Sequence, residues 1–309
     1  MPQNLRAHLA LIAVAFIYGG NYSIAKIVMD DGYLHPFAFI LLRGAVGMLL
    51  FWFFHAVFVR ERIDRRDLPL LALCGLFGIA MNQLFFFAGL RLTTPINASL
   101  IMTTTPILVL VASAILLGEV VNGRKVAGIT LGALGAIFLI AYGERIQLAT
   151  NGLLGDLMII VNASAFGIYL VLSKPLTRKY QPITIVKWAF TFGFLAILPF
   201  GFQPIQDTDW ASFPPEVWAS IGYVLIGTTF FAYLLNAYAL KHVNASVVSI
   251  YIYLQPLVAS VIALSIGKDQ LDLIKIGSGL LIFIGVFLVS RNPQRSLATT
   301  PPQPEAKRM

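Results

Sequence analysis

Charged residues are scarce in this chain: Asp, Glu, Lys and Arg make up 12% of its 309 residues, against about a quarter in an ordinary soluble domain. Hydrophobic residues make up 58%, and the mean hydropathy is +0.81. Such a composition argues against a water-soluble fold. The net charge of +8 follows from basic loops and requires no nucleic-acid partner.

Cysteine and histidine are also rare. The single Cys74 cannot form an internal disulfide, and its place within "LALCGLFG" predicts a small buried side chain. The four histidines are scattered near the ends of hydrophobic runs, and neither His-x-x-x-His nor Gly-x-Ser-x-Gly occurs. An intramembrane enzyme needs a metal set or a nucleophile with a base. We therefore expect no enzyme, no metal and no cofactor.

Long, almost uncharged runs are what the chain has in abundance. Most approach the ~20 residues that a helix needs to cross the hydrocarbon core. Because backbone amides cannot stay unpaired in lipid, and no barrel-like alternation occurs, the runs predict an all-α polytopic membrane protein. The ten candidate spans are residues 8–28, 37–59, 68–90, 96–118, 126–142, 152–173, 183–202, 217–240, 244–267 and 274–290.

The distribution of Lys and Arg predicts the orientation. If the N-terminus is cytoplasmic, most of these residues fall in cytoplasmic segments, as the positive-inside rule requires. Both termini are then cytoplasmic, in a bacterial cytoplasmic membrane. The cytoplasmic set is Arg6, Arg60, Arg62, Arg65, Arg66, Arg124, Lys125, Lys174, Arg178, Lys179, Lys241, Arg291, Arg295, Lys307 and Arg308, against Arg91, Arg145, Lys268 and Lys275 outside.

The second half of the chain repeats the pattern of the first. "NASLIMTTTP" (Asn97–Pro106) returns as "NASVVSIYIYLQP" (Asn244–Pro256), and "YGGNYSIAK" (Tyr18–Lys26) aligns with "FGIYLVLSK" (Phe166–Lys174). We interpret residues 1–143 and 144–290 as two five-helix repeats, and residues 291–309 as a disordered cytoplasmic tail. After five crossings the second repeat enters from the opposite side, so the repeats are inverted, as in alternating-access carriers.

These features together resemble the EamA group of the drug/metabolite transporter superfamily. The resemblance rests on "YGGNYSIAK", on proline in the fourth and ninth spans, on "LLGE" (Leu116–Glu119) and on the ten-span plan. Tyr18 stands where the family usually has Trp, and the second Gly-Glu is replaced by Gly267 and Lys268. The resemblance implies a multi-pass carrier, often an exporter of amino acids or other small metabolites.

Polar residues near the middle of the spans are the candidates for substrate binding. Asn and Gln facing lipid would be costly, so they should face the interior, either lining a cavity or hydrogen-bonding between helices. As a set they predict a neutral, aromatic-rich cavity suited to zwitterions or aromatic metabolites. They are Asn21, Tyr22, Asn82, Gln83, Thr104, Asn162, Tyr169, Tyr233, Asn236, Tyr251 and Gln255.

Two prolines and a few charged residues are candidates for hinges and gates. Pro106 and Pro256 interrupt their spans and are candidate hinges; neighbouring Thr hydroxyls could instead satisfy the freed carbonyls. Asn97 and Asn244 are both interpreted as helix N-caps. Arg43 and Lys26 are both expected to extend outward to the membrane surface. For Arg43, a further hypothesis is that it binds a carboxylate at the outer mouth. Glu119 is a candidate for an inner gate or proton relay.

The predicted function is therefore alternating-access transport of a small molecule through the bilayer, by a monomer or homodimer. No Asp or Glu lies at mid-depth, which favours a facilitator driven by the substrate gradient. A proton-coupled drug/metabolite antiporter that uses Glu119 is the alternative, and a channel or a membrane scaffold is a weaker one.

Overall fold

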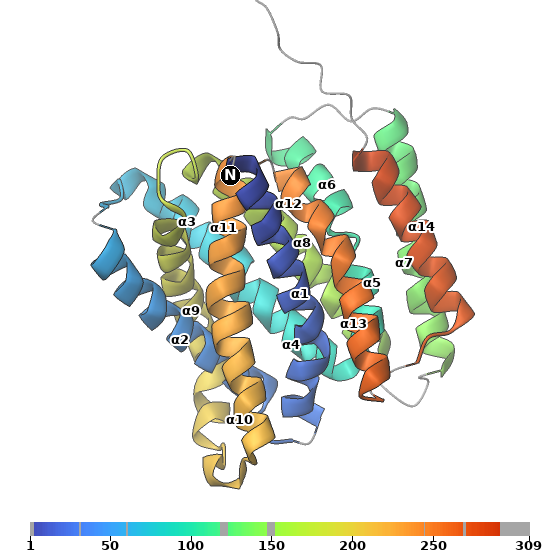
Figure 1. The fold of residues 1–309 in the computed structure, drawn as a ribbon, viewed down its shortest axis with the longest axis horizontal. Helices are drawn as coiled ribbons and strands as arrows, with labels where there is room; N and C mark the ends of the chain where they lie inside the picture. The colour runs from blue at the N-terminus through green and yellow to red at the C-terminus, as the bar shows by residue number, and fades with distance from the viewer. Residues whose placement is uncertain are drawn as a thin grey trace, which may run out of the picture.

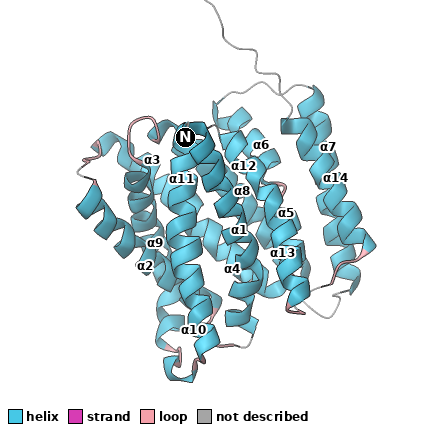
Figure 2. Ribbon diagram, in the orientation of Figure 1, coloured by secondary structure: helices cyan, strands magenta, loops and turns pink. Residues whose placement is uncertain are grey.

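A computed structural model describes residues 3–30, 32–59, 61–117, 123–146, 152–243, 245–267 and 270–290. Within these ranges the chain forms helices and loops and no strand (Figure 2). Helices pair their own backbone groups, so a chain with such long apolar runs can place them in lipid. The all-α prediction is confirmed. Glu119, Asn244 and the predicted tail fall outside the described residues.

The first half of the chain supplies three uninterrupted helices and two that are built from several segments. The uninterrupted ones are α1 (Gln3–Asp30), α2 (Pro36–Phe58) and α7 (Gly123–Ile146). The third helix consists of η1 (Arg65–Asp67), α3 (Leu68–Gly75), η2 (Leu76–Met81) and α4 (Asn82–Leu92), and the fourth of α5 (Pro95–Met102) and α6 (Thr105–Leu117).

The second half has the same order. Its uninterrupted helices are α8 (Gly152–Leu176), α9 (Pro182–Gln206) and α14 (Leu273–Ser290). A short turn, η3 (Trp210–Ser212), precedes a helix made of α10 (Pro215–Gly222), η4 (Tyr223–Phe231) and α11 (Ala232–His242). The next consists of α12 (Ala245–Ile250), η5 (Tyr251–Tyr253) and α13 (Leu254–Ser265).

By length and hydropathy, seven helices of the described chain can cross a membrane, and residues 126–135, 251–265 and 273–285 form shorter apolar helices. The chain is therefore a multi-pass membrane protein. The start of α1 and the end of α14 lie at the same end of the bundle (Figure 1). We call this the predicted cytoplasmic end, and the opposite end, where α4 ends and α8 begins, the predicted external end.

The break in the fourth helix lies before the proline. Three consecutive hydroxyls there donate to carbonyls three residues earlier: Thr103 to Leu100 (2.5 Å), Thr104 to Ile101 (2.8 Å) and Thr105 to Met102 (2.6 Å). Pro106 has no amide to offer the Met102 carbonyl, so the Thr105 hydroxyl takes that place. The Leu100 and Ile101 carbonyls also accept the backbone amides of Thr103 and Thr104.

Asn97 is not the N-cap of this helix, so that interpretation is wrong. Thr94 holds the position, and its side chain accepts a hydrogen bond from the Asn97 amide (3.3 Å). The cap lies three residues earlier than predicted because Pro95 suits the first turn of the helix.

Glycines bring helices of the two halves into close contact. At Gly155 of α8, an added Cβ would lie 2.8 Å from the Cβ of Leu92 and 2.9 Å from the carbonyl oxygen of Gly89 in α4. Helices α7 and α14 approach each other as closely, because a Cβ on Gly285 would lie 2.5 Å from the backbone nitrogen of Gly132. Small residues give membrane helices this close approach.

Gly155→Ala should therefore lower the free energy of unfolding by about 1–3 kcal/mol, and with it the Tm. The new methyl group would meet backbone atoms, and no rotamer change could relieve that contact. The matched control is Gly277→Ala in α14, where nothing lies within 4 Å of the new Cβ; it should leave the Tm unchanged or raise it. Unfolding in detergent, followed by fluorescence, measures both. Equal Tm values for the two variants would contradict the packing described here.

Candidate functional site

A small cavity lies between the two halves of the chain. Its volume is about 60 Å³, room for a few water molecules by the measure in which one water needs about 10–15 Å³. Aromatic and amide side chains dominate its wall. The lining residues are Tyr18, Asn21, Tyr22, Arg43, Asn82, Gln83, Phe86, Phe87 and Met102 from the first half, and Asn162, Phe166, Tyr233, Ile252 and Gln255 from the second.

Two π-helical segments orient part of this wall. η2 interrupts the third helix of the first half, and Asn82 and Gln83 follow it directly; η4 interrupts the corresponding helix of the second half and is followed by Tyr233. A π-turn widens the helix and changes the direction of the side chains that follow. The Tyr233 hydroxyl donates to the carbonyl oxygen of Gly78 in η2 (3.0 Å), which joins the two segments.

The structure brings together many of the polar residues that the sequence suggested, and leaves others apart. Asn236 and Tyr251 line a second hollow of about 10 Å³ beside the cavity. Thr104 and Tyr169 line neither: Thr104 bonds within its own helix, and the Tyr169 ring packs against Gly78. The predicted residues on the cavity wall are Asn21, Tyr22, Asn82, Gln83, Asn162, Tyr233 and Gln255.

Arg43 is the main correction to the sequence analysis. It does not extend outward to the membrane surface: its side chain is 3% exposed and lines the cavity. Its Nε donates to Thr229 Oγ1 (2.9 Å), its Nη2 donates to Thr228 Oγ1 (3.2 Å), and its guanidinium lies 4.6 Å from the centre of the Phe87 ring. These groups replace water around the charge, so the cavity is not neutral.

Several amide groups in this region lack partners. Among the described residues, Asn21 Oδ1, Asn162 Oδ1 and both polar atoms of Gln83 are buried without a hydrogen bond. Tyr22 donates to Gln255 Oε1 (2.9 Å), and Asn162 Nδ2 donates to the Asn82 carbonyl oxygen (2.6 Å). An unpaired buried amide costs about 1–3 kcal/mol. Such groups are few in native structures; outside the cavity wall, the described residues with one are Ser23, Asn97 and Tyr253.

Contacts between the halves close the predicted external end of the cavity. The Gly89–Gly155 crossing lies there, and beside it the Thr93 hydroxyl donates to the buried carboxylate of Asp156. Lys26, also expected to extend outward, instead donates to the carbonyl oxygens of Leu90 (3.1 Å) and Thr93. This ammonium caps the C-terminus of α4, where it is electrostatically favoured.

The predicted cytoplasmic end repeats only part of this arrangement. Lys174 Nζ donates to the carbonyl oxygens of Leu240 and Val243, each at 2.7 Å, and so caps α11 as Lys26 caps α4. The hollow beside the cavity leads toward this end, and its residue Tyr251 meets His8 Nδ1 at 2.7 Å across the two halves.

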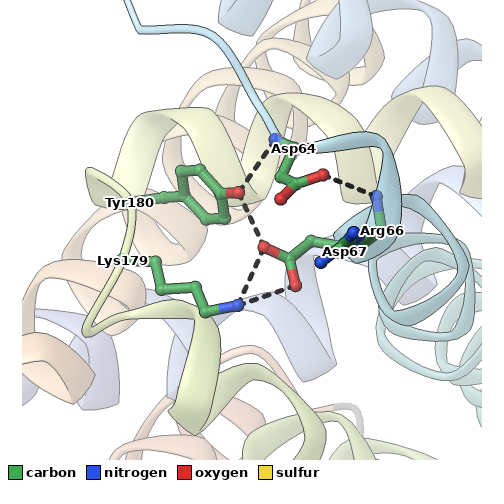
Figure 3. Close-up of polar contacts among 5 residues, drawn as sticks. All are labelled: Asp64, Arg66, Asp67, Lys179 and Tyr180. Carbon is green, nitrogen blue, oxygen red and sulfur yellow. Dashed lines mark hydrogen bonds and ion pairs between the residues drawn. The ribbon is translucent and has the colours of Figure 1, made fainter.

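At the same end, an ion pair fixes the loop between α2 and α3 to the loop between α8 and α9 (Figure 3). Lys179 Nζ lies 2.9 Å from Asp67 Oδ1, and the Tyr180 hydroxyl donates to Asp67 Oδ2 (2.7 Å) while accepting from the Asp64 amide (3.0 Å). The hydrogen bond to Asp67 raises the pKa of the Lys179 ammonium, so this link persists at neutral pH.

Apolar lining residues were missing from the prediction. Phe86, Phe87, Met102, Phe166 and Ile252 resemble the apolar residues around them in sequence. Tyr18 and Phe166 occupy matching positions in the aligned repeats, which is the one signal that pointed to them. No cluster of His, Cys, Asp or Glu that could hold a metal occurs in the described part of the chain.

Comparison with known proteins agrees with this architecture. An uncharacterized transporter of Archaeoglobus fulgidus is 28% identical over 93% of this chain and 98% of its own. A probable terminal-alkyne amino-acid exporter of Streptantibioticus cattleyicolor is 27% identical over 78% of this chain and 80% of its own. A chain of known crystal structure superposes with a TM-score of 0.62 at 19% identity, covering 91% of this chain and 98% of that one.

The family comparison covers nearly the whole sequence. The model of the EamA-like transporter family matches twice, at residues 5–141 and at residues 153–291. The two matches coincide with the halves between which the cavity lies. The chain belongs to the EamA-like transporter family.

Proposed function

We propose that this protein is an alternating-access carrier that exports amino acids or related zwitterionic and aromatic metabolites. In this proposal residues 1–143 and 144–290 are inverted five-helix repeats with cytoplasmic termini, and the cavity between them holds the substrate. The observation that carries the proposal is the cavity itself: both halves contribute polar side chains to it, some of them with unpaired amide groups.

Contacts between the two halves near both ends of the cavity favour a carrier over a channel. Helix contacts and the Thr93–Asp156 hydrogen bond close one end, and the His8–Tyr251 contact spans the halves at the other. At about 60 Å³ the cavity must widen before an amino acid fits. Rocking of one half against the other would open each end in turn.

The amino-acid exporter from Streptantibioticus cattleyicolor supports the substrate class. The transport mode follows from the position of the carboxyl groups: Asp156 lies near the predicted external end, away from the cavity wall. We therefore propose a facilitator, with proton coupling through Glu119 as the alternative. In proteoliposomes, amino-acid counterflow should proceed without a pH difference, and an imposed proton gradient should not concentrate substrate.

Substitution of cavity amides provides a direct test of the site. Asn21→Ala and Gln255→Leu should abolish counterflow, because each removes a polar group that faces the cavity, while expression stays intact. The matched control is Gln203→Leu, an exposed position in α9 whose side-chain amide bonds only Asp207 among the described residues. If both cavity variants transport at the wild-type rate, the binding site lies elsewhere.

The orientation is tested by cysteine labelling in a Cys74→Ala background. Cysteines at Gln206 and Thr208 should react with an impermeant thiol reagent added outside intact cells, and one at Asp64 should react only after permeabilisation. This follows from the positive-inside rule. Reversed labelling would show that the termini are external.

The closure of the predicted external end makes a further prediction. Thr93→Val keeps the side-chain volume but leaves the Asp156 carboxylate without its hydroxyl donor, which should destabilise the closed end. In the same cysteine-free background, a cysteine at Phe86 should then react several-fold faster with an external thiol reagent. Thr191→Val in α9, which removes the acceptor of the Trp52 indole N–H in α2 and lies off the cavity wall, is the control. Equal rates in the two variants would mean that Thr93 does not hold this end closed.

A further inference from the structure

Arg43 places an unneutralised positive charge in the wall of the cavity. A guanidinium remains protonated in proteins, and no carboxylate forms an ion pair with it among the described residues. Its partners are two neutral hydroxyls and an aromatic ring. Burying a charge without a counterion costs several kcal/mol, so this arrangement is expected where an anionic group arrives from outside the chain.

The two threonines that hold Arg43 are themselves fixed by the π-helical segment η4. Thr228 Oγ1 and Thr229 Oγ1 both donate to the Val224 carbonyl oxygen, at 2.7 and 2.9 Å. Thr228 is four residues from Val224 and Thr229 is five, so only the wider π-turn brings both hydroxyls to one acceptor. Their protons are thus committed, and their lone pairs face Arg43 Nε and Nη2.

The third guanidinium nitrogen remains available. Arg43 Nη1 makes no hydrogen bond to any described residue, and Arg43 belongs to the cavity wall. Guanidinium groups bind carboxylates through strong charge-assisted hydrogen bonds. The fixed orientation of Arg43 lowers the entropy that such binding would cost.

Besides the cationic donor Arg43, the same cavity carries hydrogen-bond acceptors. Asn21 Oδ1, Asn162 Oδ1 and Gln83 Oε1 are buried acceptors without a donor in the described chain. Asn162 is held by its Nδ2 on the Asn82 carbonyl oxygen. Three acceptor oxygens suit the three N–H groups of a primary ammonium, whereas a second carboxylate would be repelled by them.

We propose that Arg43 binds the carboxylate of the substrate and that the amide oxygens of Asn21, Gln83 and Asn162 bind its ammonium. This inference rests on the proposed function and makes it more specific, because it assigns charge selection to named atoms. The cavity then requires both charges. An organic cation without a carboxylate would leave Arg43 without an anionic partner. A carboxylate without an ammonium would leave the amide oxygens without donors.

The test measures ligand-induced thermal stabilisation of the purified wild-type protein. The probes are L-leucine and L-phenylalanine, their amides, which lack the carboxylate, and their N-acetyl derivatives, which lack the ammonium. The free amino acids should bind about 10- to 100-fold more tightly than either derivative, since each derivative leaves buried groups unpaired. An amide that binds as tightly as its parent amino acid would overturn the role of Arg43.

Variants then assign the effect to a residue. Arg43→Met should abolish the difference between amino acid and amide, and Arg43→Lys should retain part of it, because an ammonium keeps the charge and loses the planar geometry. Arg91→Met, at the exposed end of α4, is the matched control and should bind as wild type. If Arg43→Met still discriminates, the proposal is wrong. The wild-type ligand series decides the matter even if Arg43→Met does not fold.

Counterflow separates this inference from the proposed function. Carboxylate-free solutes that are carried by the wild type and by Arg43→Met at equal rates would leave the carrier intact and overturn the role of Arg43. A wild-type protein that neither binds nor transports any member of a broad metabolite panel would overturn both.

Discussion

The hydrocarbon core of a membrane offers no hydrogen bonds, so every polar group that enters it needs a partner from the protein. Most of this structure meets that condition locally. Threonine hydroxyls cover the carbonyls at the break in the fourth helix. The Lys187 ammonium lies 3.2 Å from His55 Nδ1 and 4.3 Å from the centre of the Trp52 ring. The exceptions among the described residues are the amides of Asn21, Gln83 and Asn162 on the cavity wall, and Ser23 Oγ, Asn97 Oδ1 and the Tyr253 hydroxyl outside it. In our proposal the cavity amides are the ones that bind the substrate.

The same condition connects backbone geometry to charge selection. In an ordinary α-helix a carbonyl pairs with the residue four positions on, whereas the Val224 carbonyl in η4 accepts from both the Thr228 and the Thr229 hydroxyl. The π-turn in η4 aligns them, so a buried guanidinium is held firmly by neutral groups and stays free to meet an anion. The corresponding π-turn, η2, leads into Asn82 and Gln83. Each half thus uses a π-helical segment to shape the wall that it contributes.

Much of the architecture could be predicted from the sequence, and the reasons are physical. Long apolar runs have few structural alternatives in lipid, so the helices and many polar lining residues, such as Asn21 and Gln255, were predictable from hydropathy and depth. The direction in which a charged side chain points was not predictable in this way. Arg43 lies seven residues after the start of its helix at Pro36, where extension to the interface is the usual solution. Its partners Thr228 and Thr229 lie more than 180 residues away, and a π-turn leaves no clear mark in a single sequence. Asn97 failed as a cap for a simpler reason, since Thr94 and Pro95 form a better helix start just upstream.

The lysines that cap α4 and α11 also fix the number of residues between each cap and the cavity wall. Lys26 is four residues, about one helical turn, from Tyr22 on the cavity wall, and Lys174 is eight residues, about two turns, from Phe166. Because each ammonium is fixed to a pair of carbonyl oxygens, one inserted residue between lysine and cavity would turn the lining face by about 100°. Evolution can therefore exchange side chains along these stretches of α1 and α8 far more freely than it can change their length.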